Sequence, residues 1–141
     1  MASCDNFRIE VEGISAHGST PHQGVDAILT AAHIITEIQA IVSRMNDPLN
    51  PLVVTVGKIT GGQRFNILAD KVIMEGTTRT HSPEMRKKQS LCSARSSKHS
   101  RSMGAKATLT FEYFQLRSSM TTKISSRSQE TPPLKCTVRT L

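Results

Sequence analysis

The sequence predicts one α+β domain in which a four-stranded antiparallel sheet carries two helices on one face. Two observations support this class: four segments have the residue pattern of strands and two have that of helices, and they follow one another in the order β-α-β-β-α-β. This order is typical of the ferredoxin-like, split-βαβ arrangement. A chain of 141 residues can form one domain with a hydrophobic core and is too short for two of ordinary size.

The first strand is predicted at residues 7–12, FRIEVE, where apolar and charged side chains alternate. A long amphipathic helix is predicted from about Val25 to Met45. Ile34 and Ile41 widen its apolar stripe, which suggests that the helix covers the sheet and contacts a second surface. The seam of this helix is expected to contain the apolar residues at spacings of three and four, namely Ile28, Ala31, Ile35, Ile38, Val42 and Met45.

The remaining elements follow a proline-containing stretch that ends this helix. Residues 52–59, LVVTVGKI, and 71–80, KVIMEGTTRT, predict the second and third strands. Residues 82–84, S-P-E, are a favourable helix start, with a capping hydroxyl, a proline at the first helical position and an acid near the positive end of the helix dipole. Residues 105–114, AKATLTFEYF, alternate again and predict the fourth strand.

Two segments fit this fold poorly. Residues 89–102, QSLCSARSSKHSRS, should continue the second helix but offer few apolar residues and no acid, and residues 115–141 are rich in Ser, Thr and basic residues without periodicity. We expect a domain at 1–114 and a disordered tail at 115–141. We also hypothesise that the poor segments are out-of-frame translation and that the chain is a fragment.

Charge and composition restrict the classes of partner. The net charge is +7, but nine of the eleven acidic residues precede residue 89, so the basic excess lies in the second part of the chain. The sequence has no apolar run long enough to span a bilayer and no signal peptide, and its three cysteines do not suggest a disulfide framework. We expect a cytoplasmic protein without a membrane or nucleic-acid partner.

The loop S-A-H-G-S-T-P-H-Q-G, residues 15–24, contains two histidines five positions apart. A transition-metal site needs three or four convergent ligands, and this spacing is not that of a helical zinc motif, so we expect no metal to be bound by this chain. His22 suits a capping or packing role in a tight turn. His17 is placed to donate a hydrogen bond to a group outside the domain.

Two further polar residues could contact a ligand. Asn66 follows a Gly-Gly loop at the start of a strand, where its amide offers a donor and an acceptor. Arg79, near the end of the third predicted strand, could hold a carboxylate through two hydrogen bonds. The alternative for Arg79 is a structural ion pair with Glu75 on the same face of the sheet.

The stretches FRIEVEGISAHGSTPHQGVDAILTAAHIITEIQAIVSR and VVTVGKITGGQRFNILADKVIMEGTTRT together resemble the dimerisation, or lid, domain of metallopeptidase family 20. The similarity is greatest to its hippurate hydrolases, N-acyl-amino-acid amidohydrolases and auxin-conjugate hydrolases. The resemblance implies a hydrolase of N-acyl amino acids. It also implies zinc or another divalent metal in a catalytic domain that this chain lacks.

The resemblance also implies roles for individual residues. His17 matches a lid histidine that reaches the partner subunit's active site and donates to the oxyanion of the tetrahedral intermediate, whereas His22 matches a residue that shapes the loop. Asn66 matches an asparagine that contacts substrate, and Arg79 matches an arginine that can bind a substrate carboxylate. The surfaces implied for homodimerisation are those of the helix from Val25 and the strand from Leu52.

We therefore expect an isolated lid of a metal-dependent amidohydrolase, inactive alone. One alternative is a basic nucleic-acid-binding module, because ferredoxin-like domains can bind RNA through aromatic side chains on the sheet, and Phe7, Phe111 and Tyr113 are candidates. A second alternative is a pure oligomerisation module, which would form dimers but be indifferent to mutation of Arg79.

Overall fold

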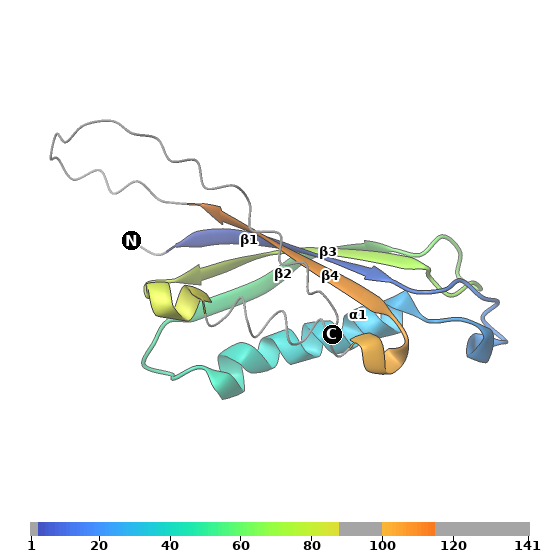
Figure 1. Cartoon of the computed structure of the whole chain (residues 1–141), viewed down its shortest axis with the longest axis horizontal. Coiled ribbons are helices and arrows are strands. Elements are labelled where there is room, and N and C mark those ends of the chain that lie inside the picture. Colours follow the sequence, from blue (N-terminus) through green and yellow to red (C-terminus); the bar gives the residue numbers. More distant parts are fainter. Residues whose placement is uncertain (1–2, 88–99, 115–141) are drawn as a thin grey trace, which may run out of the picture.

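The computed structural model describes residues 3–87 and 100–114, which form a four-stranded antiparallel sheet with the strand order β2-β3-β1-β4. The helical elements lie on one face of this sheet (Figure 1). The predicted α+β, ferredoxin-like fold is therefore confirmed. The proposed disordered tail, and most of the segment suspected of frameshifting, lie outside the described residues. The strands are β1 (Cys4–Glu12), β2 (Leu52–Gly61), β3 (Lys71–Thr80) and β4 (Lys106–Phe114).

Each face of the sheet is set by the two-residue alternation of its strands. In β1, Phe7, Ile9 and Val11 are buried beneath the helices, whereas Arg8 and Glu10 lie on the opposite face, which we call the open face. The strands β1 and β3 pair along eight residues, and β4 covers the other edge of β1. The edge strand β2 pairs with β3 and contains an irregularity between Val56 and Lys58.

The helix α1 (Ala27–Ala40) begins where the Asp26 carboxylate accepts hydrogen bonds from the backbone N–H groups of Ile28 and Leu29, at 2.8 and 3.1 Å. It continues as a π-helical turn, η2 (Ile41–Met45), and ends at the extended Asn46. The predicted helix is therefore confirmed, with a change of helical geometry in its last turn.

The predicted seam of α1 is correct for Ala31 and Ile38, which are buried, and wrong for Ile28 and Met45, which are exposed. Ile28 is 49% exposed, and Ile35 and Val42 are only partly buried. A side chain on Gly62, just after β2, would contact Ile28, so this second apolar side of α1 points toward the β2 edge. The side that enters the core contains Ala31 and Ile38 of the predicted seam, together with Ala27, Ile34 and, in η2, Ile41.

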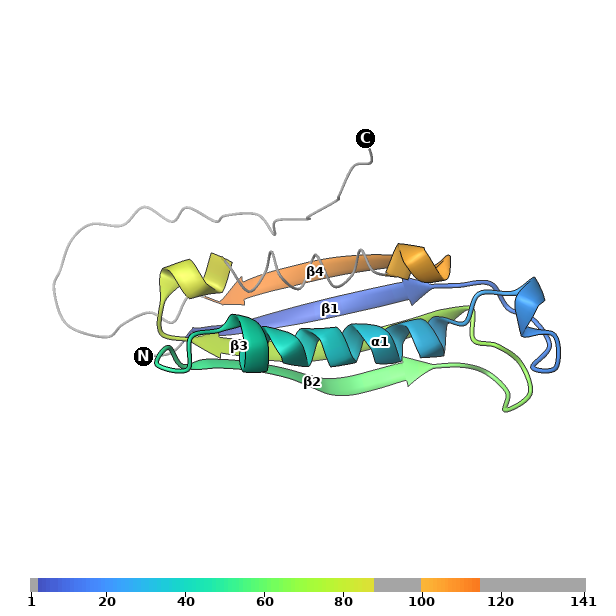
Figure 2. The ribbon, with the colours of Figure 1, turned by 90° about the horizontal axis from the view of Figure 1, so that it is seen from below.

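The second helix begins at Pro83, and residues 83–87 are helical in the described part of the chain. The Ser82 hydroxyl accepts a hydrogen bond from the backbone N–H of Met85 at 3.4 Å, as the capping prediction required. A 3-10 turn, η3 (Ser100–Met103), lies on the same face of the sheet (Figure 2). Among the described residues, none of the helices is long and apolar enough to cross a membrane.

Candidate functional site

Two loops lie side by side at one end of the sheet, and they carry two of the predicted site residues (Figures 1 and 2). The backbone N–H of Gly18 donates to the carbonyl of Asn66 at 2.8 Å, and the N–H of Leu68 donates to the carbonyl of Ala16 at 2.9 Å. His17 and Ile67 form an isolated β-bridge between these two bonds. The structure therefore brings His17 and Asn66 together through main-chain contacts, although the side chains of both are exposed.

The His17 ring is held by its own loop. The Ser19 backbone N–H donates to Nδ1 of His17 at 3.2 Å, and the Ser19 hydroxyl lies 2.7 Å from the same nitrogen. The His17 carbonyl accepts from the backbone N–H of Thr20 at 2.8 Å. Because Nδ1 accepts hydrogen bonds, the proton of the neutral ring is on Nε2. This nitrogen can donate a hydrogen bond to a group outside the loop.

Asn66 offers its amide in the same region. Its backbone carbonyl is used by Gly18, whereas its exposed side chain makes no hydrogen bond within the part of the chain that the structure describes. The amide can therefore both donate to and accept from a ligand.

Arg79 lies at the opposite end of β3. It is paired with Val53 of β2 and follows Lys71 by eight residues, which places it about 26 Å along the strand from the end that carries His17 and Asn66. Within a single chain, Arg79 therefore lies apart from His17 and Asn66.

The alternative prediction of an ion pair between Arg79 and Glu75 is wrong. The Glu75 carboxylate instead accepts from Arg8 at 2.8 Å and from Lys58 at 3.0 Å. Within residues 3–87 and 100–114, the Arg79 guanidinium has no side-chain partner, and it is exposed. It is therefore available to a carboxylate from outside these residues.

His22 lies in the exposed 3-10 turn η1 (Pro21–Gln23), away from any side-chain hydrogen bond to the described residues. Its predicted role in shaping the turn stays a prediction. In the described part of the chain, no group of three His, Cys, Asp or Glu side chains could hold a metal ion. The divalent metal that the resemblance implies therefore has no site among these residues.

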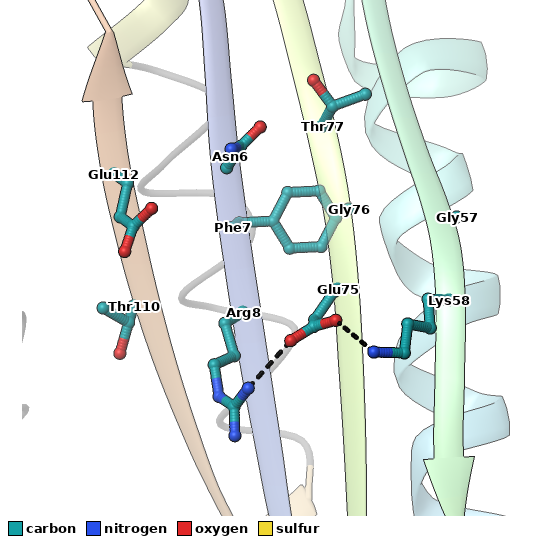
Figure 3. Close-up of a pocket in the computed structure, with 10 residues that line it drawn as sticks. All are labelled: Asn6, Phe7, Arg8, Gly57, Lys58, Glu75, Gly76, Thr77, Thr110 and Glu112. Atoms are coloured by element: carbon teal, nitrogen blue, oxygen red, sulfur yellow. Dashed lines mark hydrogen bonds and ion pairs between the residues drawn. The ribbon is translucent and has the colours of Figure 1, made fainter.

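The open face of the sheet contains a groove of about 540 Å³ that the sequence did not predict (Figure 3). Gly76 and Gly57 lie at its floor, and the Phe7 ring packs where a side chain on Gly76 would otherwise stand. Its wall includes Glu75 with its two cationic partners, and the hydrogen bond from Lys58 lowers the pKa of Glu75. Gly76 lies opposite Phe7 of β1 and Val56 of β2, and Gly57 stands at the irregularity of β2, so the groove depends on a strand register that the sequence does not display.

The fold and these residues define a two-layer α+β domain that presents polar side chains at both ends of its sheet. Residues 4–91 match the sequence model of the family described as the peptidase dimerisation domain. This match covers more than half of the chain, so the chain belongs to the dimerisation-domain family of M20 peptidases. The predicted family membership is confirmed.

Two curated relatives are similar over this region. The N-acetyl-L-cysteine deacetylase of Bacillus subtilis is 46% identical over 86 residues, which are 61% of this chain and 21% of the deacetylase. The N-acyl-L-amino acid amidohydrolase of Geobacillus stearothermophilus is 42% identical over 87 residues, which are 62% of this chain and 24% of that enzyme. The chain therefore spans less than a quarter of the length of these relatives.

A solved structure extends the comparison. The YXEP protein of Bacillus subtilis, described as a dinuclear metal-binding peptidase of the M20 family, superposes with a TM-score of 0.58 at 28% identity. The matched part is 81% of this chain and 26% of that protein.

Proposed function

We propose that this chain is the dimerisation lid of a metal-dependent amidohydrolase that hydrolyses the amide bond of N-acyl amino acids. The family membership and the names of the two curated relatives support this substrate class. The zinc or other divalent ions would be held by a catalytic domain outside the described residues. The lid alone would not hydrolyse substrate.

The β2 edge and the second apolar side of α1 are the surface through which two copies would pair. The strand β2 is ten residues long and lies at the edge of the sheet, so its outer backbone groups can pair with another strand. Val53 and Ile59 of β2 are half-exposed, and so is Ile28 on the adjacent side of α1. Burying these side chains would stabilise a dimer.

Symmetry then explains why His17 and Arg79 lie far apart in one chain. Two β2 strands paired about a two-fold axis perpendicular to the sheet run antiparallel. The Gly61 end of one β2, beside the loops of His17 and Asn66, would lie next to the Val53 end of the other β2. In the partner, Arg79 lies beside Val53 at that position. Each end of the joined sheet would therefore carry His17 and Asn66 from one copy and Arg79 from the other.

The three residues would have distinct roles at each end of the joined sheet. The Nε2–H of His17 would donate to the oxyanion of the tetrahedral intermediate, and such preorganised donors contribute about 10²- to 10³-fold to kcat. The Asn66 amide would contact the substrate beside it. Arg79 would hold the carboxylate of the amino-acid part through its planar pair of N–H donors.

The observation that best supports this proposal is the main-chain contact that holds the His17 loop beside the Asn66 loop. A chimeric enzyme tests it. Residues 4–87 would replace the matched lid of the Bacillus subtilis N-acetyl-L-cysteine deacetylase. His17→Ala should lower kcat about 100-fold or more, whereas His22→Ala in the same loop should change kcat less than about threefold. An active chimera indifferent to His17→Ala would contradict the proposal.

Dimer formation requires its own measurement. Sedimentation of the full chain should show a dimer, and Ile28→Glu should convert it to a monomer with unchanged circular dichroism. Thr36 is also exposed on α1 but is not part of the proposed interface, so Thr36→Glu is the matched control and should leave the dimer intact. Equal sedimentation of the two variants would contradict this interface.

In the structure, the nucleic-acid alternative loses two of its three candidate aromatic residues, and the third, Tyr113, which is 40% exposed, stacks against Phe111. Phe7 and Phe111 are 4% and 5% exposed and lie on the face that the helices cover, with ring centroids 5.9 Å apart. The open face instead carries acidic and basic side chains in ion pairs. The remaining alternative, a pure oligomerisation module, predicts that Arg79→Met leaves the KM of the chimera unchanged.

A further inference from the structure

We propose that Ser19 is a positioning residue that fixes the tautomer and orientation of the His17 ring. Ser19 would hold Nδ1 as an acceptor and thereby present Nε2–H as the donor. This inference rests on the proposed function, in which Nε2 of His17 contacts the reacting group. Ser19 itself would not touch substrate.

The chemistry of the two donors determines the direction of the contact. A backbone N–H can only donate, so the bond from Ser19 N–H to His17 Nδ1, at 3.2 Å, requires a lone pair on that nitrogen. A proton on Nδ1 would face the amide proton and would remove the acceptor. The Ser19 hydroxyl, at 2.7 Å from Nδ1, then donates as well, and it is the closer of the two groups.

The exposure of His17 explains why hydrogen bonds from Ser19 to its ring matter. An exposed imidazole without partners can rotate about its side-chain bonds and exchange its proton between the two nitrogens. Oxyanion donors act through preorganisation, because they then need no reorientation during the reaction. Thr20 holds the His17 carbonyl at 2.8 Å, so the loop fixes the backbone and Ser19 fixes the ring.

Nitrogen NMR of the full chain labelled with ¹⁵N-histidine tests the proposal. Spectra would be recorded at about pH 8.5, where an imidazole of ordinary pKa, about 6.5, is neutral. The His17 signals, assigned by their loss in His17→Gln, should show the Nε2–H tautomer. Ser19→Ala should shift the ratio of the tautomers toward Nδ1–H by about two- to tenfold, the range expected from one hydrogen bond.

Matched variants make the test specific. Ser15→Ala removes a hydroxyl from the same loop, where it donates to the Leu68 carbonyl, and should leave the His17 tautomer unchanged. Ser19→Thr keeps the hydroxyl and should restore the wild-type ratio. His22, whose ring has no side-chain hydrogen bond to the described residues, provides the reference for an unconstrained imidazole in the same spectrum.

Two outcomes would overturn the proposal: a wild-type His17 with the tautomer ratio of His22, or a ratio that Ser19→Ala and Ser15→Ala change equally. The tautomer is measured without substrate or metal, so it does not depend on catalysis. A His17→Ala chimera that keeps its activity would remove the proposed function and leave the tautomer result intact. The two failures are thus distinguishable.

Discussion

Two arginine–carboxylate pairs involve the same strand, β1, but lie on opposite faces of the sheet. On the covered face, Arg86 of the second helix donates two hydrogen bonds to Asp5, whose side chain is fully buried, and its guanidinium lies 4.9 Å from the centroid of the Tyr113 ring. On the open face, Arg8 donates to Glu75 at 2.8 Å, with side chains that are 45% and 38% exposed.

Burial makes these chemically similar pairs different in consequence. A buried carboxylate that loses its guanidinium partner remains desolvated, and breaking such a pair typically costs several kcal/mol. Breaking an exposed pair costs little free energy, because water solvates both groups when they separate. The Asp5–Arg86 pair is therefore expected to attach the second helix to the sheet, and the Arg8–Glu75 pair to modulate the surface.

The largest expected effect follows from breaking the buried pair. Arg86→Met keeps the aliphatic stem but removes the guanidinium from Asp5, and we expect the free energy of unfolding to fall by about 4 kcal/mol. Urea unfolding of the full chain measures this change. Arg79→Met, at an exposed position of β3, should change the free energy by less than about 0.5 kcal/mol. Similar losses in both variants would remove the distinction between the faces.

A smaller effect tests which side of α1 belongs to the covered face. Ile34 is 1% exposed and Ile28 is 49% exposed. Ile34→Ala should lower the free energy of unfolding by about 3 kcal/mol, and Ile28→Ala by less than about 1 kcal/mol in the monomer. Urea unfolding at low protein concentration measures both. The reverse order would restore the seam predicted from the sequence.

This helix also shows how far the sequence predicts the fold. Alternation and β-branched residues located all four strands, and one of them, at residues 71–80, has the predicted bounds. The helix was predicted correctly, but apolar residues occupy both its core side and its second side. Periodicity alone could not decide which side faces the sheet, because that depends on tertiary contacts such as those of Ile34.

The candidate site was predictable in its residue types but not in its geometry. His17, Asn66 and Arg79 were singled out from their local sequence, and the resemblance supplied their roles, which stay predictions. The expected contact between Arg79 and Glu75 failed because residues four apart in a strand are about 13 Å from each other, whereas directly opposite residues on neighbouring strands lie about 5 Å apart. The partners of Glu75, Arg8 and Lys58, follow from strand register, which the sequence does not display.

The third prediction concerns the exposed pair. Arg8→Met removes one partner of Glu75, but Lys58 still donates to that carboxylate at 3.0 Å. We therefore expect a loss of stability clearly smaller than in either variant above, and smaller still in 1 M salt, where charges are screened beyond about 3 Å. Paired urea curves at low and high salt measure it. A loss as large as that of Arg86→Met would contradict the comparison.

The smallest expected effect is a pH dependence of the open face. Hydrogen bonds from Lys58 and Arg8 lower the pKa of Glu75 below its ordinary value of 4.5 in the folded chain. Between the two values the unfolded chain binds more protons than the folded one, so acidification favours unfolding. The contribution of Glu75 is complete above about pH 4.5 and is lost as the pH falls through the folded value.

A difference measurement isolates this small contribution from that of other carboxylates. The urea midpoint of the wild-type chain minus that of Glu75→Gln should be positive at pH 7 and should shrink toward zero below pH 4.5. Glu112→Gln, which removes a carboxylate that lines the same groove, is the matched control, and its difference from wild type should change less over this range. A Glu75 difference that grows on acidification has the wrong sign for a lowered pKa and would contradict the ion-pair network of the open face.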